Sequence, residues 1–340
     1  MANKIRELQA NDLLKVEDLY RLIYPDNSEL SKGIEELKWL LADPNNPDKL
    51  NGYIALDEKD EILGVIGYTI NTYRFGNKKI TGAIPMSWMI APGNRGILGI
   101  QLLLKVMKLA DFGFAIGGSK EARNSYKAVK LEHVGEAVIY TKVFKPLKFL
   151  ISSNQPFLIK MAKSVYYLGK HSKKKKNAIT LGNYDGRIPE IDEISNDLSD
   201  VVTDNRIQWL LRCPLVKAKA FILKNNNKEL GVAVCYIKQC EHGVKRGRIV
   251  HIQYLNSNID LYCDVISALE EFLLREGCCS VTVLGMNSSF KTALLHCHYK
   301  TLKNTKRLVY IRDPENNYSN ILFSNWHITY YQSDKGYRSI

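Results

Sequence analysis

The segment 84–110 constrains the fold of this chain more than any other stretch. It opens with an apolar run that ends at Met89 and Ile90, which predicts a buried strand. The turn-forming sequence Ala-Pro-Gly-Asn follows at residues 91–94, and from Ile100 onward apolar residues recur at helical spacing. The predicted order is therefore a strand, a glycine-bearing loop and a helix.

The loop in this segment has the composition of an anion site. Gly96 and Gly99 would let the backbone approach a phosphate without an intervening Cβ, and Arg95 adds a matching charge. The helix that follows offers unpaired N–H groups at its N-terminus. The spacing matches neither the P-loop nor the G-x-G-x-x-G fingerprint, so a tight turn without a ligand is the alternative.

Length and charge limit the class of protein. A chain of 340 residues predicts two domains of roughly 150 residues each. The formal net charge of +13 predicts anionic partners, which leaves nucleic acid, a membrane surface and polyphosphate small molecules open. The charged, amphipathic start does not resemble a signal peptide, and no apolar run is long enough for a membrane span. We therefore expect a cytoplasmic protein without membrane insertion.

The cysteines predict buried free thiols. All seven lie in the second half of the chain, their number is odd, and several fall in apolar runs. The Cys-Glu-His sequence at 240–242 and the His-Cys-His sequence at 296–298 fit no zinc spacing. No metal is expected.

The first half of the chain predicts one α/β (α+β) domain, with helices packed on a mixed sheet. Helices are predicted at 11–24, 31–42 and 119–129, and strands at 52–56, 62–73, 112–117 and 134–142, in addition to the strand and helix of 84–110. The domain boundary is placed at residue 145.

Residues 146–200 predict a linker. Apolar residues between 157 and 168 make one face of a helix, and the run Lys173–Lys176 follows. A basic amphipathic helix on an anionic membrane is one interpretation. A linker helix packed across both domains, ending in a solvated lysine loop, is favoured because one short apolar face supplies too little area for membrane binding.

Residues 201–340 repeat the order of the first half weakly. Helices are predicted at 207–212, 260–276 and 288–296, and strands at 218–223, 230–239, 248–255, 280–284, 307–311 and 328–331. The junction at 255–260, which corresponds to the glycine loop, has neither Gly nor Arg. A duplicated fold in which only one copy keeps the phosphate loop is the working hypothesis, with one such site per chain.

Two partial signatures resemble the GNAT superfamily of N-acetyltransferases. The family motif R-G-x-G-I-G-x-x-L-L stands here as Arg-Gly-Ile-Leu-Gly-Ile-Gln-Leu-Leu at 95–103, with the second glycine displaced by one position. The motif N-x-x-A-x-x-x-Y-x-K-x-G-F stands as residues 119–131, where Ala122 and Tyr126 match, Ser119 replaces Asn, and Lys-Leu replaces Gly-Phe. The resemblance implies two GNAT-like domains in tandem, each with a mixed, mainly antiparallel sheet flanked by helices.

The tandem layout is similar to a narrower group. It resembles bacterial two-domain acyltransferases that N-acylate nucleotide-linked amino sugars, such as dTDP-linked ones, for surface polysaccharides, and the tail 326–334 resembles their C-terminal strand. FemX-like aminoacyltransferases, which use aminoacyl-tRNA, share the architecture, and a non-catalytic GNAT-fold scaffold is a third alternative. Nucleic acid is not favoured as a partner because the only dense basic run is Lys173–Lys176. A homodimer stays open.

The GNAT resemblance implies direct acyl transfer from acyl-CoA to an amine. Loop amides would bind the pyrophosphate, the strand before the loop would bind the pantetheine arm and direct an amide at the thioester oxygen, and Tyr126 would protonate the leaving thiolate. The expected cofactor-binding residues are Met89, Ile90, Arg95, Gly96, Ile97, Leu98, Gly99, Ile100 and Ser119.

The base and the acceptor site are less well defined. The strand 85–88 carries no carboxylate, so His133 and His327 are candidate bases, with Glu132 and Glu136 as further options. Proton loss to water from a well-positioned amine is the alternative. Acceptor-binding candidates are Ser87, Trp88 and Trp326, together with Tyr68 and Tyr73, and core packing is the competing role for the aromatic ones.

Overall fold

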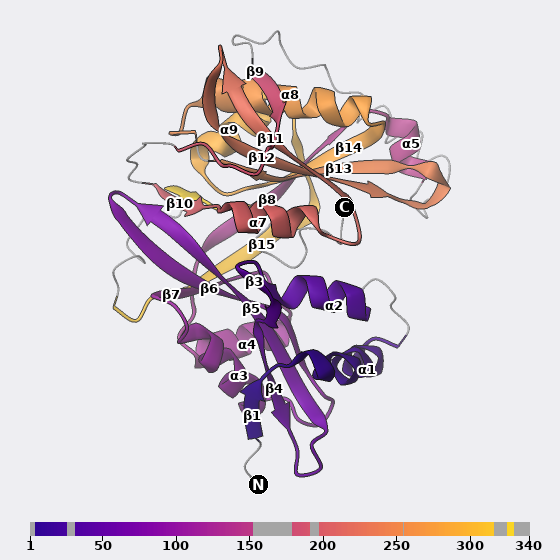
Figure 1. The fold of residues 1–340 in the computed structure, drawn as a ribbon, viewed down its shortest axis with the longest axis vertical. Helices are drawn as coiled ribbons and strands as arrows, with labels where there is room; N and C mark the ends of the chain where they lie inside the picture. Colours follow the sequence, from indigo (N-terminus) through magenta and orange to yellow (C-terminus); the bar gives the residue numbers. More distant parts are fainter. Residues whose placement is uncertain are drawn as a thin grey trace.

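A computed structural model shows one large mixed sheet flanked by helices (Figure 1). It describes residues 4–25, 31–151, 179–190, 197–253, 255–315 and 325–329. Within these residues the main sheet has 14 strands, most of them in antiparallel pairs. The predicted α/β class, a mixed and mainly antiparallel sheet flanked by helices, is therefore confirmed, whereas the division into two tandem domains stays a prediction. Among the helices formed by the described residues, none is long and apolar enough to cross a membrane.

The first half of the chain, residues 4–151, begins at the lower end of the view in Figure 1. Its elements are β1 (Lys4–Glu7), α1 (Leu13–Ile23), α2 (Ile34–Leu41), β2 (Ala42–Asp43), β3 (Asn46–Leu50), β4 (Gly52–Leu56), β5 (Ile62–Phe75), β6 (Lys78–Ile90), α3 (Ile97–Met107), β7 (Phe112–Ile116), α4 (Lys120–Ala128), β8 (Glu132–Val143) and α5 (Pro146–Ile151).

The second half, residues 179–329, forms the upper part of the view. Its elements are β9 (Ile179–Asn183), β10 (Leu198–Val201), α7 (Asp204–Leu211), β11 (Lys217–Asn225), β12 (Lys228–Gln239), β13 (Lys245–Ile252), α8 (Ile259–Arg275), β14 (Cys278–Gly285), α9 (Ser288–His296), β15 (Lys300–Arg312) and β16 (Trp326–His327).

The elements differ from the prediction in places where strand pairing sets their bounds. Strand β6 begins at Lys78, earlier than predicted, because it forms a long hairpin in which Lys78 pairs with Phe75 of β5. Strands β9 and β10 lie within the predicted linker and pair with β11 and β5. The tail strand β16, Trp326–His327, pairs with β10 and lies just before the predicted strand 328–331, of which residues 330 and 331 lie outside the described ones. The apolar face at 157–168 and the lysine run at 173–176 lie outside the described residues.

The two halves exchange strands. The sheet runs in the order β7-β15-β8-β14, so β15 of the second half lies between two strands of the first. In turn β8, of the first half, pairs along six residues with β14, from Val143↔Ser280 to Val138↔Gly285. Because strand hydrogen bonds satisfy backbone groups that would otherwise be buried without partners, neither half completes its sheet alone.

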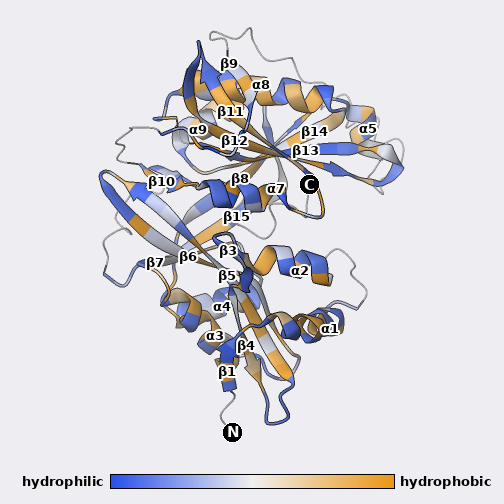
Figure 2. Cartoon of the chain, viewed as in Figure 1, coloured by the Kyte–Doolittle hydropathy of each residue, from blue (hydrophilic) through white to orange (hydrophobic). Residues whose placement is uncertain are grey.

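Apolar residues cover both faces of the sheet and continue across the junction of the halves (Figure 2). In the first half, α3 packs Leu102, Leu103 and Val106 against one face. In the second half, α8 and α9 cover a separate core. A third cluster joins the halves and contains Phe112 from β7 and Trp326 from β16. The helices α3 and α8 each carry a polar and an apolar side, as expected for helices that pack on a sheet.

A pair of tryptophans joins the halves. Trp39 of α2 and Trp209 of α7 stack with ring centroids 4.6 Å apart and an interplanar angle of 9°. Each indole N–H donates to the other's carbonyl oxygen, at 2.8 and 2.7 Å. Both tryptophans stand in the same local sequence, Trp-Leu-Leu-x-x-Pro, at 39–44 and 209–214. The pair is therefore a symmetric contact between two copies of one motif, as expected for an internal duplication.

Arg206 reinforces this junction. Its guanidinium donates to Thr69 Oγ1 and to Asn71 Oδ1, both at 2.6 Å, on strand β5 of the first half. It also lies 5.2 Å from the Trp209 ring centroid, within the range of a cation–π contact. Charge and stacking thus fix α7 of the second half to β5 and α2 of the first.

The cysteines confirm one sequence expectation. All seven are free, and five of them are buried. Burial raises the pKa of Cys213 and of Cys278 to about 12, so these thiols stay protonated at neutral pH.

Removing either tryptophan should destabilise the whole chain. We expect Trp39→Ala and Trp209→Ala each to lower the free energy of unfolding by about 3–5 kcal/mol, measured by urea denaturation. The double variant should cost clearly less than the sum, because each single substitution already removes the same stacking and hydrogen bonds. As a control, Trp39→Ala combined with Phe290→Ala in the second-half core should be additive. If the losses in unfolding free energy simply add for Trp39→Ala and Trp209→Ala, the contact contributes no coupling energy.

Candidate functional site

The sheet opens between β6 and β7. These strands run parallel, and their register covers only Gly82↔Phe112 and Ala83↔Gly113. On its other edge β6 stays paired with β5 as far as Ile90. Within the described chain, the stretch of β6 beyond Ala83 therefore turns one backbone edge toward a gap in the sheet rather than toward a neighbouring strand.

A β-bulge lies on β6 beside this gap. Val65 pairs with Met89 and Gly67 with Met86, so Ser87 and Trp88 together oppose one residue of β5. Ser87 adopts a positive φ of 50°, which is unfavourable for a residue with a side chain. The Ser87 hydroxyl and the Trp88 indole N–H are buried without a hydrogen-bond partner among the described residues. Strain and unsatisfied polar groups of this kind concentrate at functional sites.

The N-terminus of α3 stands at the edge of the same gap without a side-chain cap. Its N-cap residue is Gly96, with φ 107° and ψ −116°, and the first intrahelical bond runs from Ile100 N–H to the Gly96 carbonyl. The N–H groups of residues 97–99 precede that bond. By contrast, Ser119 caps α4 by accepting from Ala122 N–H at 3.2 Å. The α3 terminus is thus available to an anion.

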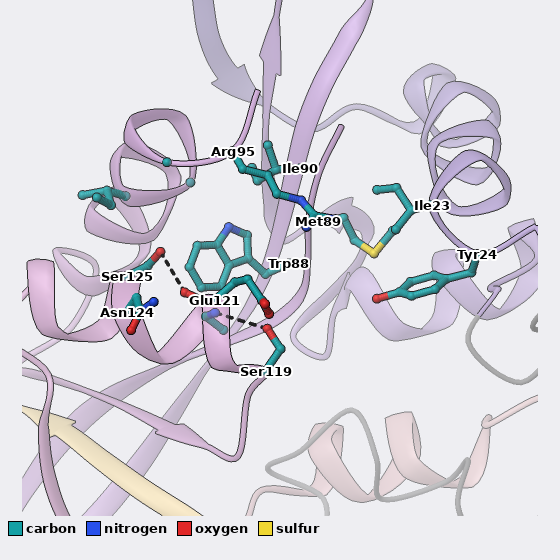
Figure 3. A pocket seen from close by; sticks show the side chains of 14 residues that line it. Ile23, Tyr24, Trp88, Met89, Ile90, Arg95, Ser119, Glu121, Asn124 and Ser125 are labelled. Atoms are coloured by element: carbon teal, nitrogen blue, oxygen red, sulfur yellow. Dashed lines mark hydrogen bonds between the residues drawn. The ribbon is translucent and has the colours of Figure 1, made fainter. Parts of the chain in front are cut away.

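A pocket of about 530 Å³ occupies this region (Figure 3). In the close-up, Ile23 and Tyr24 at the end of α1 lie on the Met89 side, and side chains of α4 lie on the Trp88 side. The lining residues are Ile23, Tyr24, Trp88, Met89, Ile90, Arg95, Gly96, Gly99, Ile100, Ser119, Glu121, Ala122, Asn124 and Ser125.

The two loop glycines have different roles. A Cβ on Gly96 would meet no protein atom within 4 Å, so within the chain itself it is the backbone conformation at φ 107° that requires glycine here. A Cβ on Gly99 would lie 3.2 Å from Trp88 Cζ2. Gly99 therefore allows α3 to pack closely on the Trp88 indole, and both glycines line the pocket, so the approach of a phosphate to them stays a prediction.

Most of the expected cofactor-binding residues surround the pocket. Seven of the nine line it, namely Met89, Ile90, Arg95, Gly96, Gly99, Ile100 and Ser119. The other two lie elsewhere: Ile97 is 75 % exposed, and Leu98 is 4 % exposed within the core beneath α3. Their backbone N–H groups still belong to the first turn of α3, which is the part of them that an anion would contact.

Several lining residues had no local signal in the sequence. Ile23 and Tyr24 come from α1, more than sixty positions before β6 ends, and only the tertiary structure brings them to the pocket. Glu121 stands in the first turn of α4, where a carboxylate is favoured by the helix dipole. Hydrogen bonds from its own backbone N–H and from the Ser119 side chain lower the pKa of Glu121.

Tyr126 lies behind the pocket wall. It is 5 % exposed and does not line the pocket, but its ring stacks on Trp88, which does, at a centroid distance of 6.2 Å. Its hydroxyl lies over the loop before α4, since a Cβ on Gly118 would come within 2.8 Å of the Tyr126 oxygen. Gly118 has a φ of 103°, so the loop needs glycine on both counts.

The other predicted residues lie outside the pocket. His133 is exposed on β8 and contacts the ring of Tyr310 at 5.6 Å. Ser87 is buried in the bulge, and Trp326 is fully buried in the core that joins the halves. Of the further aromatic candidates, Tyr73 is fully buried in that same core, and Tyr68 stacks on Tyr53.

His327 lies in the second half. Its Nε2 bonds the Ile252 carbonyl at 2.8 Å, and its ring packs on Tyr262 and Phe290. Burial lowers the pKa of His327 to about 4, so the imidazole is neutral at pH 7. These contacts account for a structural role beside β13, and His327 does not line the pocket.

The equivalent place in the second half is filled by the chain itself. There β13 and β14 form the parallel pair, and α8 and α9 follow them as α3 and α4 follow β6 and β7. Asn258 caps α8 by accepting from Leu261 N–H. The Asp197 carboxylate accepts from Ser257 Oγ, just before α8, and from Asn287 Nδ2, the N-cap of α9, at 2.8 and 3.2 Å.

The tail completes this filling. Residues 326–329 lie against β13, where His327 bonds the Ile252 carbonyl and Thr329 Oγ1 bonds His251 Nδ1 at 3.1 Å. The starts of α8 and α9 and the edge of β13 thus have polar partners from within the chain. The expectation of a single phosphate loop per chain stays a prediction.

The fold of this chain is similar to that of several solved structures. No protein-family model and no curated protein sequence matches this chain. Among solved structures, it is similar to Saccharomyces cerevisiae N-myristoyltransferase with bound myristoyl-CoA, at TM-score 0.58 and 11% identity, covering 92% of this chain and 82% of that one. A GCN5-related N-acetyltransferase from Anabaena variabilis matches at TM-score 0.54 and 10% identity, covering 92% and 72%.

A third structure extends the likeness to a chain of similar length. A putative acetyltransferase from Pyrococcus horikoshii matches at TM-score 0.51 and 14% identity, covering 91% of this chain and 89% of that one. The chain therefore has the fold of GNAT-type N-acyltransferases over nearly its whole length, including both halves.

The backbone conformation of Gly96 should affect ligand affinity more than the space around this residue does. We expect Gly96→Ala to weaken binding of inorganic pyrophosphate to this predicted anion site about fivefold or more in isothermal titration, because a Cβ at φ 107° costs about 1–3 kcal/mol and displaces the first amides of α3. Gly93→Ala is the matched control, since Gly93 lies in the same loop at φ 86° and does not line the pocket. Equal loss of affinity in both variants would assign the effect to general loop disorder.

Proposed function

We propose that this protein is an acyl-CoA-dependent N-acyltransferase that acts on the amino group of a nucleotide-linked amino sugar, such as a dTDP-linked one. The observation that carries the proposal is the pocket between β6 and α4, bounded by the uncapped N-terminus of α3. The GNAT-type fold supports it, and one structure of that fold is described with bound myristoyl-CoA.

The α3 terminus would hold the pyrophosphate of acyl-CoA. The N–H groups of residues 97–99 would donate to phosphate oxygens, and the helix dipole favours negative charge at this end. Arg95 lines the pocket and can add a charge-assisted bond. On this proposal, the residues of the partial signature at 95–103 act mainly through the backbone geometry of the loop rather than through their side chains.

The open edge of β6 would bind the pantetheine arm. Between Ala83 and Ile90 this edge faces the gap, so an extended ligand can bond to it as an added strand would. The bulge at Ser87 and Trp88 turns the local backbone, and an amide there can be directed at the thioester oxygen. A donor of that kind contributes about 2.7–4 kcal/mol to the transition state of acyl transfer.

Tyr126 would protonate the leaving thiolate. Its hydroxyl lies against Gly118, in the loop that presents Ser119 to the pocket, so acyl-CoA would have to bring its thioester sulfur to this wall for the proton to transfer. Glu121 is the carboxylate among the pocket residues, but hydrogen bonding lowers its pKa and makes it a weak base. The amine proton would therefore leave through water once the amine is positioned against the thioester.

The acceptor class rests on the tandem resemblance and on charge. A formal net charge of +13 suits a substrate that carries a nucleotide diphosphate. The pocket is built from one chain, so the proposal does not depend on a dimer.

Two measurements on the purified chain test the proposal. In native mass spectrometry with acetyl-CoA we expect one bound molecule per chain, because Asn258 caps α8, the helix of the second half that corresponds to α3. In a thiol-release assay, acetyl-CoA and a panel of dTDP- and UDP-linked amino sugars should give turnover. Absence of any bound CoA would refute the enzymatic proposal. Absence of bound CoA together with aminoacyl transfer from aminoacyl-tRNA, measured as release of deacylated tRNA, would assign the FemX-like alternative.

Tyr126→Phe should slow turnover about a hundredfold or more while the affinity for CoA changes less than about twofold, because only the proton donor is lost. Tyr68→Phe is the matched control: Tyr68 belongs to the same core cluster, but its ring stacks on Tyr53 instead of Trp88. Equal kcat for Tyr126→Phe and wild type across the pH range would remove Tyr126 as the acid.

A further inference from the structure

Strand exchange brings a residue of the second half to Tyr126. Tyr310 lies on β15, where it pairs with Ala115 of β7 on one side and with His133 of β8 on the other. Its side chain is 8 % exposed and belongs to the core cluster of the first half, together with Tyr126 and Leu102. The second half therefore contributes a residue to the core that lies behind the first-half pocket.

Two aromatic rings hold Tyr126. The Trp88 ring stacks on it at 6.2 Å with an interplanar angle of 22°, and the Tyr310 ring meets it at 5.1 Å and 56°. Both geometries are favourable aromatic contacts. Trp88 is fixed in turn by α3, since it packs against Gly99. Tyr310 is fixed by the β15 ladder to β7 and β8.

We infer that Tyr310 is a positioning residue for Tyr126, and this inference rests on the proposed function. A general acid must come within about 2.6–3.2 Å of the atom it protonates, and a displacement of about 1 Å can cost on the order of a hundredfold in rate. Without the Tyr310 ring, Tyr126 has a cavity beside it and can move away from the Gly118 loop. Tyr310 itself does not line the pocket.

The strand alternation makes this role specific to one position. Val309 and Ile311, on either side of Tyr310, belong to the core that joins the halves on the opposite face of the sheet. Tyr310 alone of these three points toward Tyr126. Through this contact Tyr310, a residue of β15, touches the predicted acid Tyr126 directly.

The test compares Tyr310→Leu with Tyr310→Phe in the full chain. We expect Tyr310→Leu to lower kcat for thiol release from acetyl-CoA at least tenfold, with the dissociation constant of CoA within about twofold of wild type. Tyr310→Phe keeps the ring and should restore kcat to near the wild-type value. Val309→Ala is the matched control, since it removes buried volume from the same strand on the other face and should leave kcat unchanged.

A double-mutant cycle separates positioning from general damage. If Tyr310 acts through Tyr126, then Tyr310→Leu should reduce kcat little further in a Tyr126→Phe background. The inference would be overturned if the double variant lost kcat by the product of the two single factors, or if Val309→Ala lost as much kcat as Tyr310→Leu.

A measurement without turnover keeps the inference independent of the acceptor. In NMR of the protein with ¹³C-labelled tyrosine, the Tyr126 ring should flip faster in Tyr310→Leu than in wild type and in Val309→Ala. An unchanged flip rate would overturn the inference whatever the activity. A faster flip together with a wild-type protein that neither binds CoA nor turns over would instead refute the proposed function and leave only the packing contact.

Discussion

The hydrogen-bond ladder of β15 holds the molecule together as one unit. This strand is inserted between β7 and β8, and β8 is thereby placed against β14 of the second half. Each half would otherwise expose the edge of an incomplete sheet, with its row of unpaired backbone groups. The tryptophan pair Trp39–Trp209 and the Arg206 contacts lie across the same junction and depend on the register that the ladder sets.

The same sheet leaves one place open, and the pocket lies there. After two paired residues β6 and β7 diverge, while β6 stays anchored to β5 on its other edge. The bulge with Ser87 at positive φ and the uncapped α3 terminus are local departures from the most stable geometry. Such departures persist when the surrounding structure determines them, and here α3, α4 and the end of α1 surround them.

Comparison of the halves shows how one layout yields two outcomes. In the first half the N-terminus of α3 begins at a glycine and faces the pocket. In the second half Asn258 caps α8, the Asp197 carboxylate joins the starts of α8 and α9, and the tail covers β13. Polar groups that are satisfied within the chain have no need of a ligand, and the starts of α8 and α9 are satisfied in this way. The repeated Trp-Leu-Leu-x-x-Pro motif is the sequence trace of the common layout.

The sequence by itself determined the local parts of this protein. Apolar periodicity and turn residues located most helices and strands, and the glycine loop at 95–99 identified one wall of the pocket. Only the tertiary structure decided which strands are neighbours, because pairing joins residues such as Tyr310 and His133 that lie far apart in the chain. The contribution of Ile23 and Tyr24 to the pocket, the burial of Trp326 and the contact of Tyr310 with Tyr126 follow from that pairing. Local patterns report the conformation of each segment, whereas the contacts between segments depend on how they pack.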